Sequence, residues 1–254
     1  MQPDTAVQQH SSGMHDLVGP HALKTAACAV GLHDKGGDGE FTIHAAHTER
    51  HRLEASRLVH HRYVQRGYRR EHPAGECEIN VLTLSAIDPQ GATLGTLGIR
   101  FDVAQGLSAD GAFEEEMRML RGQGRKICEF TQLALDDLGA SKLVLAALFH
   151  TAYLHAYKIY GIELLVIEVN PRHVPYYRRM LDFKVCSEVR TNAQVHAPAV
   201  LMCLEMAHAE QQLARYAGHP AMLNVVRNLY PLFLNSEQEA KVLARLKEEY
   251  RQAA

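Results

Sequence analysis

Short blocks of apolar residues alternate with polar and turn-forming residues from position 41 onward, and these blocks predict a mixed α/β domain. Strands are expected where apolar and β-branched residues gather between turn residues, and helices where apolar residues recur every three or four positions. The expected strands are 41–45, 79–87, 94–101, 126–135, 164–169, 183–189 and 200–204, and the expected helices are 49–65, 113–120, 143–160 and 173–180. A strand–helix–strand unit over 126–169, flanked by antiparallel hairpins, implies a mixed sheet with helices packed on it.

Three of these elements carry the strongest signals. Residues 143–160 show the apolar spacing of an amphipathic helix, which Gly161 is expected to end. Residues 164–169 form an apolar run typical of a strand that is buried on both faces. The segment Asp88-Pro-Gln-Gly91, which separates two apolar runs, predicts the turn of a β-hairpin.

The two ends of the chain differ in composition from the region between them, which suggests three parts. Residues 1–40 are rich in Gln, Ser, His, Gly and Asp, and they predict a flexible leader. Residues 41–205 hold the predicted sheet. Residues 206–254 form a C-terminal extension that is expected to be helical throughout, with a capping box at Ser236-x-x-Glu239 opening its last helix.

Charge and cysteine content argue against several classes of protein. A net charge of −2 and a pI of about 6.8 argue against a nucleic-acid-binding protein, which normally presents a basic face. The five cysteines are scattered and form no CxxC pair, which favours reduced thiols in a cytoplasmic protein over a disulfide framework. None of the 16 histidines lies in a metal-binding motif, so no metal site is expected. The N-terminus lacks a signal-peptide pattern, and the longest apolar run, 143–149, is too short to cross a bilayer.

Two segments of the predicted core resemble known enzyme families. The segment 113–136 carries Glu129-Phe-Thr-Gln-Leu133 on an expected strand, and 170–183 reads Asn-Pro-Arg-His-Val-Pro-Tyr-Tyr-Arg-Arg-Met-Leu-Asp-Phe. The first is similar to N-acyl amino acid synthases of the FeeM type and, more distantly, to the acyl-homoserine-lactone autoinducer synthases. The second resembles the segment that closes the core of GNAT acyltransferases. The resemblance extends over roughly residues 41–205.

The resemblance implies a GNAT-like α/β (α+β) fold and an enzyme that moves a long-chain fatty acyl group from acyl carrier protein to the amino group of an amino acid. It implies no tightly bound cofactor, because the acyl group arrives as a thioester on acyl-phosphopantetheine of the carrier protein or on coenzyme A. GNAT enzymes that use acyl-CoA hold its pyrophosphate on a glycine-containing loop at a helix N-terminus. The corresponding connection here, 136–142, has one glycine and two aspartates, which would repel a pyrophosphate. The sequence therefore favours the carrier protein as donor.

The expected strand 126–135 carries the candidate catalytic residues. Residues two apart on a strand share a face, so Glu129, Thr131 and Leu133 are expected on one side. Glu129 is the candidate general base, with a pKa raised by a partly apolar site, and an ion pair with a neighbouring arginine is the alternative. Thr131 is a candidate hydrogen-bond partner of the amine or the pantetheine, or simply a strand residue. As the resemblance implies, a backbone N–H at a bulge near Leu133 or Ala134 would bind the oxyanion.

The candidate acceptor site lies on the helix 49–65 and near the same strand. The resemblance implies that Arg57 binds the carboxylate of an amino-acid acceptor through a bidentate contact, although an exposed helix arginine fits equally. Tyr63 and Tyr68 would cover the acceptor or pack in the core. Gln132 stands where the autoinducer synthases have arginine, so it is assigned to substrate binding and argues against a homoserine-lactone product.

Aromatic residues are candidates for contacts with the leaving group and the acyl chain. Tyr176 or Tyr177 would protonate the departing thiolate, as a tyrosine does in many acetyltransferases. Phe149 and Tyr153 begin an aromatic stripe that continues to Tyr157 and Tyr160 at helical spacing. Such a stripe usually packs in a core, and the alternative is the wall of an acyl tunnel.

A basic cluster precedes the strand that carries Glu129. It comprises Arg118, Arg121, Arg125 and Lys126. Acyl carrier proteins are strongly acidic, so this cluster is a candidate docking surface, and a solvated face is the alternative. The role of the C-terminal extension is open among covering an acyl tunnel, docking the carrier protein and forming a dimer.

Three other functions remain open from the sequence: an autoinducer synthase, an acetyl-CoA-dependent acetyltransferase, and a non-catalytic protein that binds lipid or a partner. Gln132 and the helical extension count against the first, and the two-aspartate connection counts against the second. The intact Glu129 counts against the third. No transmembrane segment is expected, and a loose membrane association through the lipid product is left open.

Overall fold

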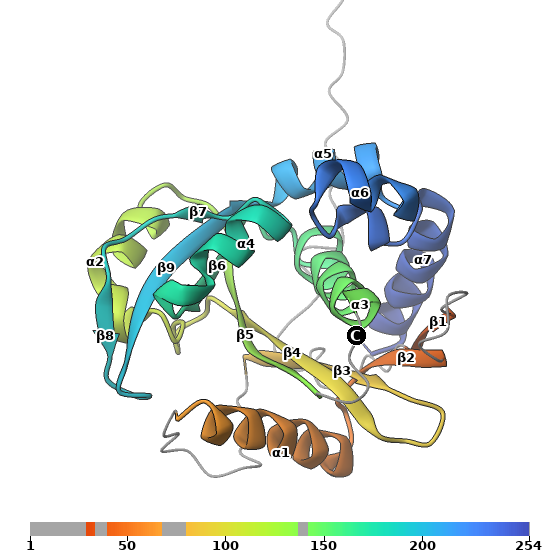
Figure 1. Ribbon diagram of the computed structural model, residues 1–254, viewed down its shortest axis with the longest axis horizontal. Coiled ribbons are helices and arrows are strands. Elements are labelled where there is room, and N and C mark those ends of the chain that lie inside the picture. Colours follow the sequence, from red (N-terminus) through yellow and green to blue (C-terminus); the bar gives the residue numbers. More distant parts are fainter. Residues whose placement is uncertain (1–28, 34–39, 68–79, 137–141, 254) are drawn as a thin grey trace, which may run out of the picture.

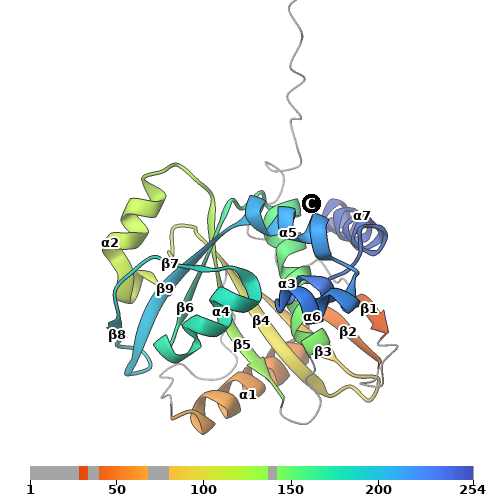
Figure 2. The ribbon, with the colours of Figure 1, turned by 45° about the horizontal axis from the view of Figure 1, so that its top comes forward.

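The protein is described here by a computed structural model that covers residues 29–33, 40–67, 80–136 and 142–253. Its elements in chain order are β1 (Ala29–His33), β2 (Glu40–Ala45), α1 (Glu49–Gln65), β3 (Val81–Ile87), β4 (Thr93–Phe101), α2 (Asp110–Arg121), β5 (Ile127–Leu135), α3 (Lys142–Tyr153), β6 (Leu164–Val169), α4 (Val174–Leu181), β7 (Lys184–Val185), β8 (Arg190–Asn192), β9 (Ala197–Glu205), α5 (Met206–Tyr216), α6 (Leu223–Val226) and α7 (Ser236–Ala253). The sheet has the strand order β1-β2-β3-β4-β5-β6-β9-β7, and β8 pairs with β9 beside this path. The mixed sheet flanked by helices is therefore confirmed (Figures 1 and 2). In the described ranges, no helix combines the length and the apolar character needed to span a bilayer.

The N-terminal half of the sheet, β1 to β5, is antiparallel throughout. The hairpin between β3 and β4 is closed by Asp88, whose carboxylate accepts the backbone N–H groups of Gln90 and Ala92 at 2.9 and 2.7 Å. Strand β1 lies inside the segment predicted to be a flexible leader, so that prediction is wrong for Ala29–His33. Its backbone pairs with β2, which would otherwise leave an edge of unpaired N–H and C=O groups.

Strands β5 and β6 run parallel and separate after a short paired stretch. They pair only over Ile127–Glu129 and Leu164–Val166. Beyond Glu129, β5 follows β4 as far as Leu135, whereas β6 follows β9 as far as Val169. The two halves of the sheet therefore diverge like the arms of a V (Figure 1).

Alternate side chains of the central strands point into two separate cores. Phe130 on β5 and Ile167 on β6 belong to the large core under α3. Ile127 and Val166, on the opposite face, belong to the smaller core under α2. By the alternation of β5, Glu129 lies on the α2 face, at the point where β5 and β6 separate.

Helix α3 is buried on all sides, so the prediction of an amphipathic helix is wrong. Every residue from Val144 to Tyr153 is buried. The sheet covers one side of the helix and the C-terminal extension covers the other (Figure 2). The expected span is confirmed, although its last turn, Leu154–Ile159, is π-helical.

The C-terminal extension consists of α5, a run of short turns and α7, so the prediction of helix throughout is also wrong. Single 3₁₀ turns at Pro220–Met222 and Tyr230–Leu232 and the short α6 separate the two longer helices. The capping box of α7 begins one residue earlier than expected. Asn235 accepts the N–H of Gln238 at 2.9 Å, and the Gln238 side chain accepts the N–H of Asn235 at 3.1 Å.

Two buried histidines fasten the extension to α3. The Nδ1 of His150 accepts the N–H of Leu234 at 2.9 Å, so its Nε2 carries the proton and donates to Glu239 at 3.1 Å. The Nδ1 of His155 lies 3.0 Å from the Tyr250 hydroxyl. Burial lowers the pKa of His150, and it lowers the pKa of His155 to about 3. Both rings are therefore neutral at pH 7.

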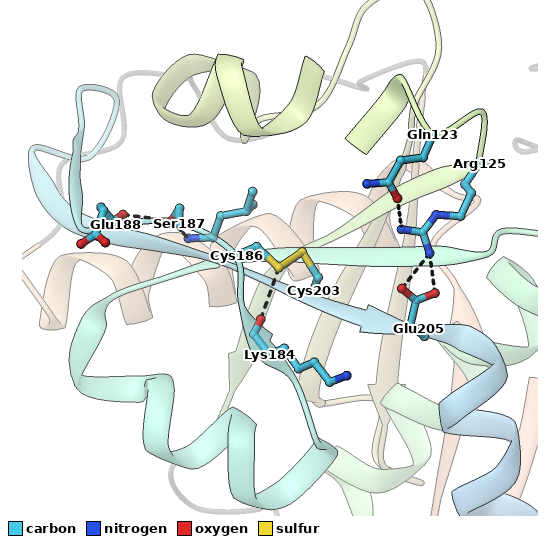
Figure 3. Close-up of a disulfide and its surroundings, with 9 residues drawn as sticks. Gln123, Arg125, Lys184, Cys186, Ser187, Glu188, Cys203 and Glu205 are labelled. Atoms are coloured by element: carbon cyan, nitrogen blue, oxygen red, sulfur yellow. Dashed lines mark hydrogen bonds and ion pairs between the residues drawn. A yellow bond between two sulfur atoms is a disulfide. The ribbon is translucent and has the colours of Figure 1, made fainter. Parts of the chain in front are cut away.

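A disulfide joins Cys186, which follows β7, to Cys203 on β9 (Figure 3). The expectation of reduced thiols is therefore wrong for this pair. The two residues are 17 positions apart, and only the antiparallel pairing of β7 with β9 brings them together. Cys128 is a free, buried thiol. Cys28 and Cys77 lie outside the described residues.

Candidate active site

A β-bulge interrupts β5 shortly after Glu129. The register with β4 shifts between Thr131 and Ala134, so that Gln132 and Leu133 stand opposite a single β4 residue. Gln132 has a left-handed φ of 53°. A bulge leaves its extra residue outside the hydrogen-bond ladder and redirects the local backbone. The predicted position of the bulge is confirmed, and its oxyanion-binding role stays a prediction.

A cavity of about 780 Å³ lies where β5 and β6 separate. Part of its wall is polar and is formed by Asn80, Arg100, Ser108, Glu129, Glu168 and Asn192. Another part is apolar and includes Leu97, Phe130, Leu133, Phe149 and Ile167, while α1 and α4 contribute Tyr63, Arg66 and Tyr177. A concave cavity of this size that combines apolar walls with polar and ionisable side chains is typical of a small-molecule site.

Glu129 is the most perturbed carboxyl group of the cavity. Its side chain is only 2% exposed, and its Oε2 accepts the backbone N–H of Ser108 at 2.6 Å. Burial raises the pKa of Glu129 to about 7, because a carboxylate loses its hydration there. The carboxyl is therefore half ionised near neutral pH, which suits a general base.

Two charged neighbours shift the pKa of Glu129 in opposite directions. Arg100 lies opposite Glu129 in the register with β4 and lowers its pKa, whereas Glu168 raises it. A carboxylate in a dominant ion pair would have a pKa below its ordinary value. Burial outweighs Arg100, so the pKa of Glu129 is raised, which is compatible with a general base; the role itself stays a prediction.

The other candidates on β5 also line the cavity. Thr131, Gln132 and Leu133 all contribute to the wall beside Glu129. Gln132 lies in the bulge, where the two-residue alternation of the strand is broken. Gln132 therefore reaches the same space as its neighbours, which suits the substrate-binding role assigned to it.

The two adjacent tyrosines of α4 differ in position. Tyr177 lines the cavity, and its ring packs edge-to-face on Phe183 with 5.9 Å between centroids. Tyr176 is 39% exposed and does not line the cavity. Burial raises the pKa of Tyr177, so its hydroxyl stays protonated at neutral pH. Of the two, Tyr177 is the candidate acid for the leaving thiolate.

Replacing Tyr177 with phenylalanine is expected to lower kcat by roughly 10²-fold if its hydroxyl protonates the thiolate. The matched control is Tyr176→Phe, which should stay within about twofold of the parent, because that side chain lies outside the cavity. Steady-state rates of thiol release would measure both. Equal losses in the two variants would exclude the assignment to Tyr177.

The acceptor site differs from the expectation on α1. Arg57 is exposed and does not line the cavity, so the alternative of an exposed helix arginine holds. Tyr63 does line the cavity, and so does Arg66 at the end of the helix. Sequence reasoning missed Arg66 because α1 carries several arginines, and only the packing of the helix on the sheet shows which one faces the site. Tyr68 lies outside the described residues.

Glu168 and Asn192 are further cavity residues that sequence reasoning missed. The Asn192 amide donates a hydrogen bond to the Glu168 carboxylate, and burial raises the pKa of Glu168. The available signal was a carboxylate inside the apolar run 164–169, since a buried charge needs a partner or a function. Across the described ranges, no group of three or more His, Cys, Asp or Glu side chains is placed to hold a metal ion.

The aromatic stripe of α3 divides between two pockets. Phe149 lines the cavity, whereas Tyr153 lines a smaller apolar pocket behind Phe130 and Phe149. Tyr157 and Tyr160 line neither of these pockets. The tunnel-wall interpretation therefore fits only the first half of the stripe.

The predicted basic docking cluster is partly neutralised within the chain. Arg121 pairs with Asp102 at 2.8 Å and with Asp110 at 2.7 Å. Arg125 pairs with Glu205, as Figure 3 shows. Arg118 and Lys126 remain exposed. The interpretation of all four as one cationic surface is therefore wrong, because tertiary contacts bring carboxylates to the two inner arginines.

Comparison with protein families places this site in a known context. A family model described as "N-acyl amino acid synthase FeeM" matches residues 54–205. This range covers more than half of the chain and includes Glu129, the bulge and Tyr177. It ends at Glu205, where the C-terminal extension begins. No curated protein matches the chain.

Solved structures give the same fold. The chain is similar to FeeM, an N-acyl amino acid synthase from uncultured soil microbes, at 26% identity and a TM-score of 0.59, covering 67% of this chain and 93% of that one. The AHL synthase LasI is matched at 15% identity and a TM-score of 0.48, covering 66% and 91%. The likeness to LasI is too low to support an argument about its reaction. The likeness to FeeM confirms the GNAT-like fold.

Proposed function

Because the chain belongs to the family of FeeM-type N-acyl amino acid synthases, and is thus an N-acyltransferase, we propose that it transfers a long-chain fatty acyl group from acyl carrier protein to the amino group of an amino acid. The observation that carries this proposal is the Glu129 carboxyl, buried in the cavity wall beside a β-bulge with a pKa of about 7. Amine acylation needs a base, an oxyanion site, an acid and an apolar site, and the described residues supply a candidate for each.

The first half of the proposed reaction takes place beside the bulge. The ammonium group of the acceptor gives a proton to the Glu129 carboxylate, directly or through one water. The free amine attacks the thioester carbonyl, and the C–N bond forms as the carbonyl electrons move to oxygen. The backbone N–H of Leu133 stabilises this oxyanion, with Thr131 beside it as a further hydrogen-bond partner.

The second half expels the thiol. The tetrahedral intermediate collapses, the C–S bond breaks, and the thiolate takes a proton from Tyr177. The acceptor nitrogen loses two protons in all. One replaces the proton that Tyr177 gave to the thiol, and the other leaves from Glu129 to solvent. The products are the N-acyl amino acid and the free phosphopantetheine thiol.

The carboxylate of the acceptor is assigned to Arg66, in place of Arg57. Arg66 lines the cavity at the end of α1. The pKa of His173, another residue of the cavity wall, is lowered mainly by burial, then by the charge of Arg172 and then by the charge of Arg66. A guanidinium can bind a carboxylate through two parallel hydrogen bonds. Tyr63, one turn earlier, lines the same wall and would cover the bound amino acid.

The assignment of acyl carrier protein as donor rests on the sequence between β5 and α3. The two aspartates of 136–142 disfavour the pyrophosphate of coenzyme A, and residues 137–141 lie outside the described part of the chain. The exposed Arg118 and Lys126 keep the proposed docking role for the acidic carrier. We also propose a cytoplasmic location, where such thioesters are made, and only loose membrane contact through the lipid product. The disulfide between Cys186 and Cys203 differs from the reduced thiols that are typical of that compartment.

The proposal is tested with purified protein, a set of amino acids, and the same acyl groups presented on carrier protein or on coenzyme A. Mass spectrometry should find an N-acyl amino acid with the carrier-bound donor and none with the Glu129→Gln variant. Lipid extracts of cells that overproduce either form should show the same difference. Higher kcat/KM with coenzyme A would overturn the donor assignment. An acyl-homoserine lactone, or no acylated amine at all, would overturn the proposed function.

A further inference from the structure

Two pockets of the structure share a wall. Phe130 and Phe149 line both the catalytic cavity and the smaller pocket on the α3 face of the sheet. Their ring centroids are 6.2 Å apart. A ligand chain that passes these rings from the catalytic cavity therefore arrives in the smaller pocket.

The smaller pocket is lined by apolar and aromatic residues, and nearly half of them come from the C-terminal extension. These residues are Met206, Ala209 and Leu213 of α5 and Tyr230 and Phe233 of the turns before α7. All of them are buried. The extension lies beyond residue 205, where the family match ends. It therefore lies outside the matched range.

We propose that the C-terminal extension forms the distal wall of the acyl-chain site and limits the length of the acyl group. This inference rests on the acyl transfer proposed above. Binding of the thioester oxygen at the Leu133 bulge fixes one end of the chain, and burial of methylene groups requires an apolar, water-free path for the rest. The apolar wall of the cavity leads past Phe130 and Phe149 to α5.

The proposed wall is held from two sides. The Tyr230 hydroxyl donates to the carbonyl oxygen of Leu181 at 3.0 Å, and the N–H of Leu229 donates to the carbonyl of Met180 at 3.0 Å. These bonds tie the extension to α4, the helix that carries Tyr177. On the other side, His150 ties it to α3 through Leu234 and Glu239. A wall fixed in this way sets a defined end for the chain.

The free volume of the smaller pocket is about 20 Å³, room for a single water molecule. Additional methylene groups therefore have to displace wall side chains, and the bulk of those side chains sets the limit. Leu213→Ala should extend the accepted length, and Ala209→Leu should shorten it. Each methylene group of the acyl chain that becomes buried in the apolar pocket, or is excluded from it, should change the affinity for the acyl donor roughly fourfold.

The decisive measurement is the ratio of kcat/KM for a longer and a shorter acyl chain on the same carrier. Leu213→Ala should raise this ratio by about tenfold or more, and Ala209→Leu should lower it by a similar factor. The matched control is Leu246→Ala, because Leu246 is fully buried in the same extension but does not line the pocket. It should lower the melting temperature and leave the ratio unchanged. A ratio that is unchanged in both pocket variants, or changed equally in Leu246→Ala, would overturn the proposal.

A binding experiment separates this inference from the proposed reaction. S-alkyl pantetheine thioethers of graded length cannot transfer an acyl group, so calorimetric titration reports the chain site alone. A length optimum that shifts in Leu213→Ala and Ala209→Leu in the stated directions supports the wall, even if no amino acid is acylated. An optimum that stays fixed in both variants overturns it, even if transfer to an amino acid is found.

Discussion

Replacing Glu129 with glutamine should lower kcat/KM at pH 7 by about 10²- to 10⁴-fold and, in the same protein, raise thermal stability. The loss of activity follows from the loss of the proton acceptor for the attacking amine. In the parent enzyme kcat/KM should rise with pH through about 7, where the buried carboxyl ionises, and this limb should be absent from the variant. The pH profiles of both proteins, measured with the same acyl donor, would check the assignment.

The gain in stability follows from the raised pKa of the same group. The pKa of Glu129 rises from 4.5 to about 7 on folding, so the folded state holds a proton that the unfolded state has lost between these pH values. The stability this group contributes is fully present below pH 4.5 and is lost as pH rises through about 7. At about pH 8 the parent therefore carries a buried charge that costs roughly 3 kcal/mol, which glutamine removes. Urea unfolding at about pH 8 and about pH 4 should show a gain for the variant only at the higher pH.

A control variant is available at Glu163, directly before β6. Glu163→Gln changes an exposed carboxylate that accepts the N–H of Lys126 and does not line the cavity. It should leave both activity and the pH dependence of stability close to those of the parent. If Glu129→Gln lost stability at pH 8 together with activity, its carboxylate would be a structural partner of Arg100 instead of a base.

Protonation of His155 is expected to loosen the C-terminal extension in acid. Its folded pKa of about 3 lies below the ordinary 6.5, so above pH 6.5 the ring is neutral in both states and its contribution is complete. As pH falls below 6.5 only the unfolded chain takes up the proton, and the free energy of unfolding drops by about 1.4 kcal/mol per pH unit from this group. The cause is burial, with His47 adding a small effect of the same sign. His150 adds to the same trend, because burial also lowers its pKa.

The His155 contribution is isolated by comparing variants at two pH values. His155→Leu should have a lower free energy of unfolding than the parent at about pH 7.5. This difference should shrink by roughly 2 kcal/mol at about pH 5, because the parent loses stability when its unfolded His155 takes up a proton and leucine does not titrate. Tyr250→Phe removes the hydrogen-bond partner but keeps the buried imidazole, so its deficit should change little with pH. Urea unfolding followed by circular dichroism measures all three proteins. A His155→Leu deficit that is equal at both pH values would mean that the ring is protonated in the folded state.

Several elements and one site residue were predictable because their signals are local. The helix 49–65 has the predicted bounds, and the Thr48 side chain that accepts the N–H of His51 caps it. The strand 164–169 and the turn at Asp88 are likewise confirmed. Glu129 was found as a candidate base from its place on the expected strand and the resemblance of Glu129-Phe-Thr-Gln-Leu133 to known enzyme families, and its raised pKa agrees with that prediction. Its catalytic role stays a prediction.

Only tertiary structure decided which side chains meet. The sequence could not choose between Tyr176 and Tyr177, or between Arg57 and Arg66, because the direction a helix residue faces depends on how the helix packs on the sheet. From the sequence, Arg121 was predicted to belong to a cationic cluster. In the folded chain it forms ion pairs with Asp102 and Asp110, which neutralise its charge.

The dependence on tertiary contacts also explains why the predictions of an amphipathic α3 and of reduced Cys186 and Cys203 were wrong. Helix α3 is buried all round because a segment far along the chain covers its outer face, and Cys186 meets Cys203 only through strand pairing. Local periodicity and capping specify where helices and strands begin and end, since those signals lie within a few residues of each other. Burial, charge pairing and the pKa values of the site depend on contacts between distant segments, and these are set by the packing of the whole chain.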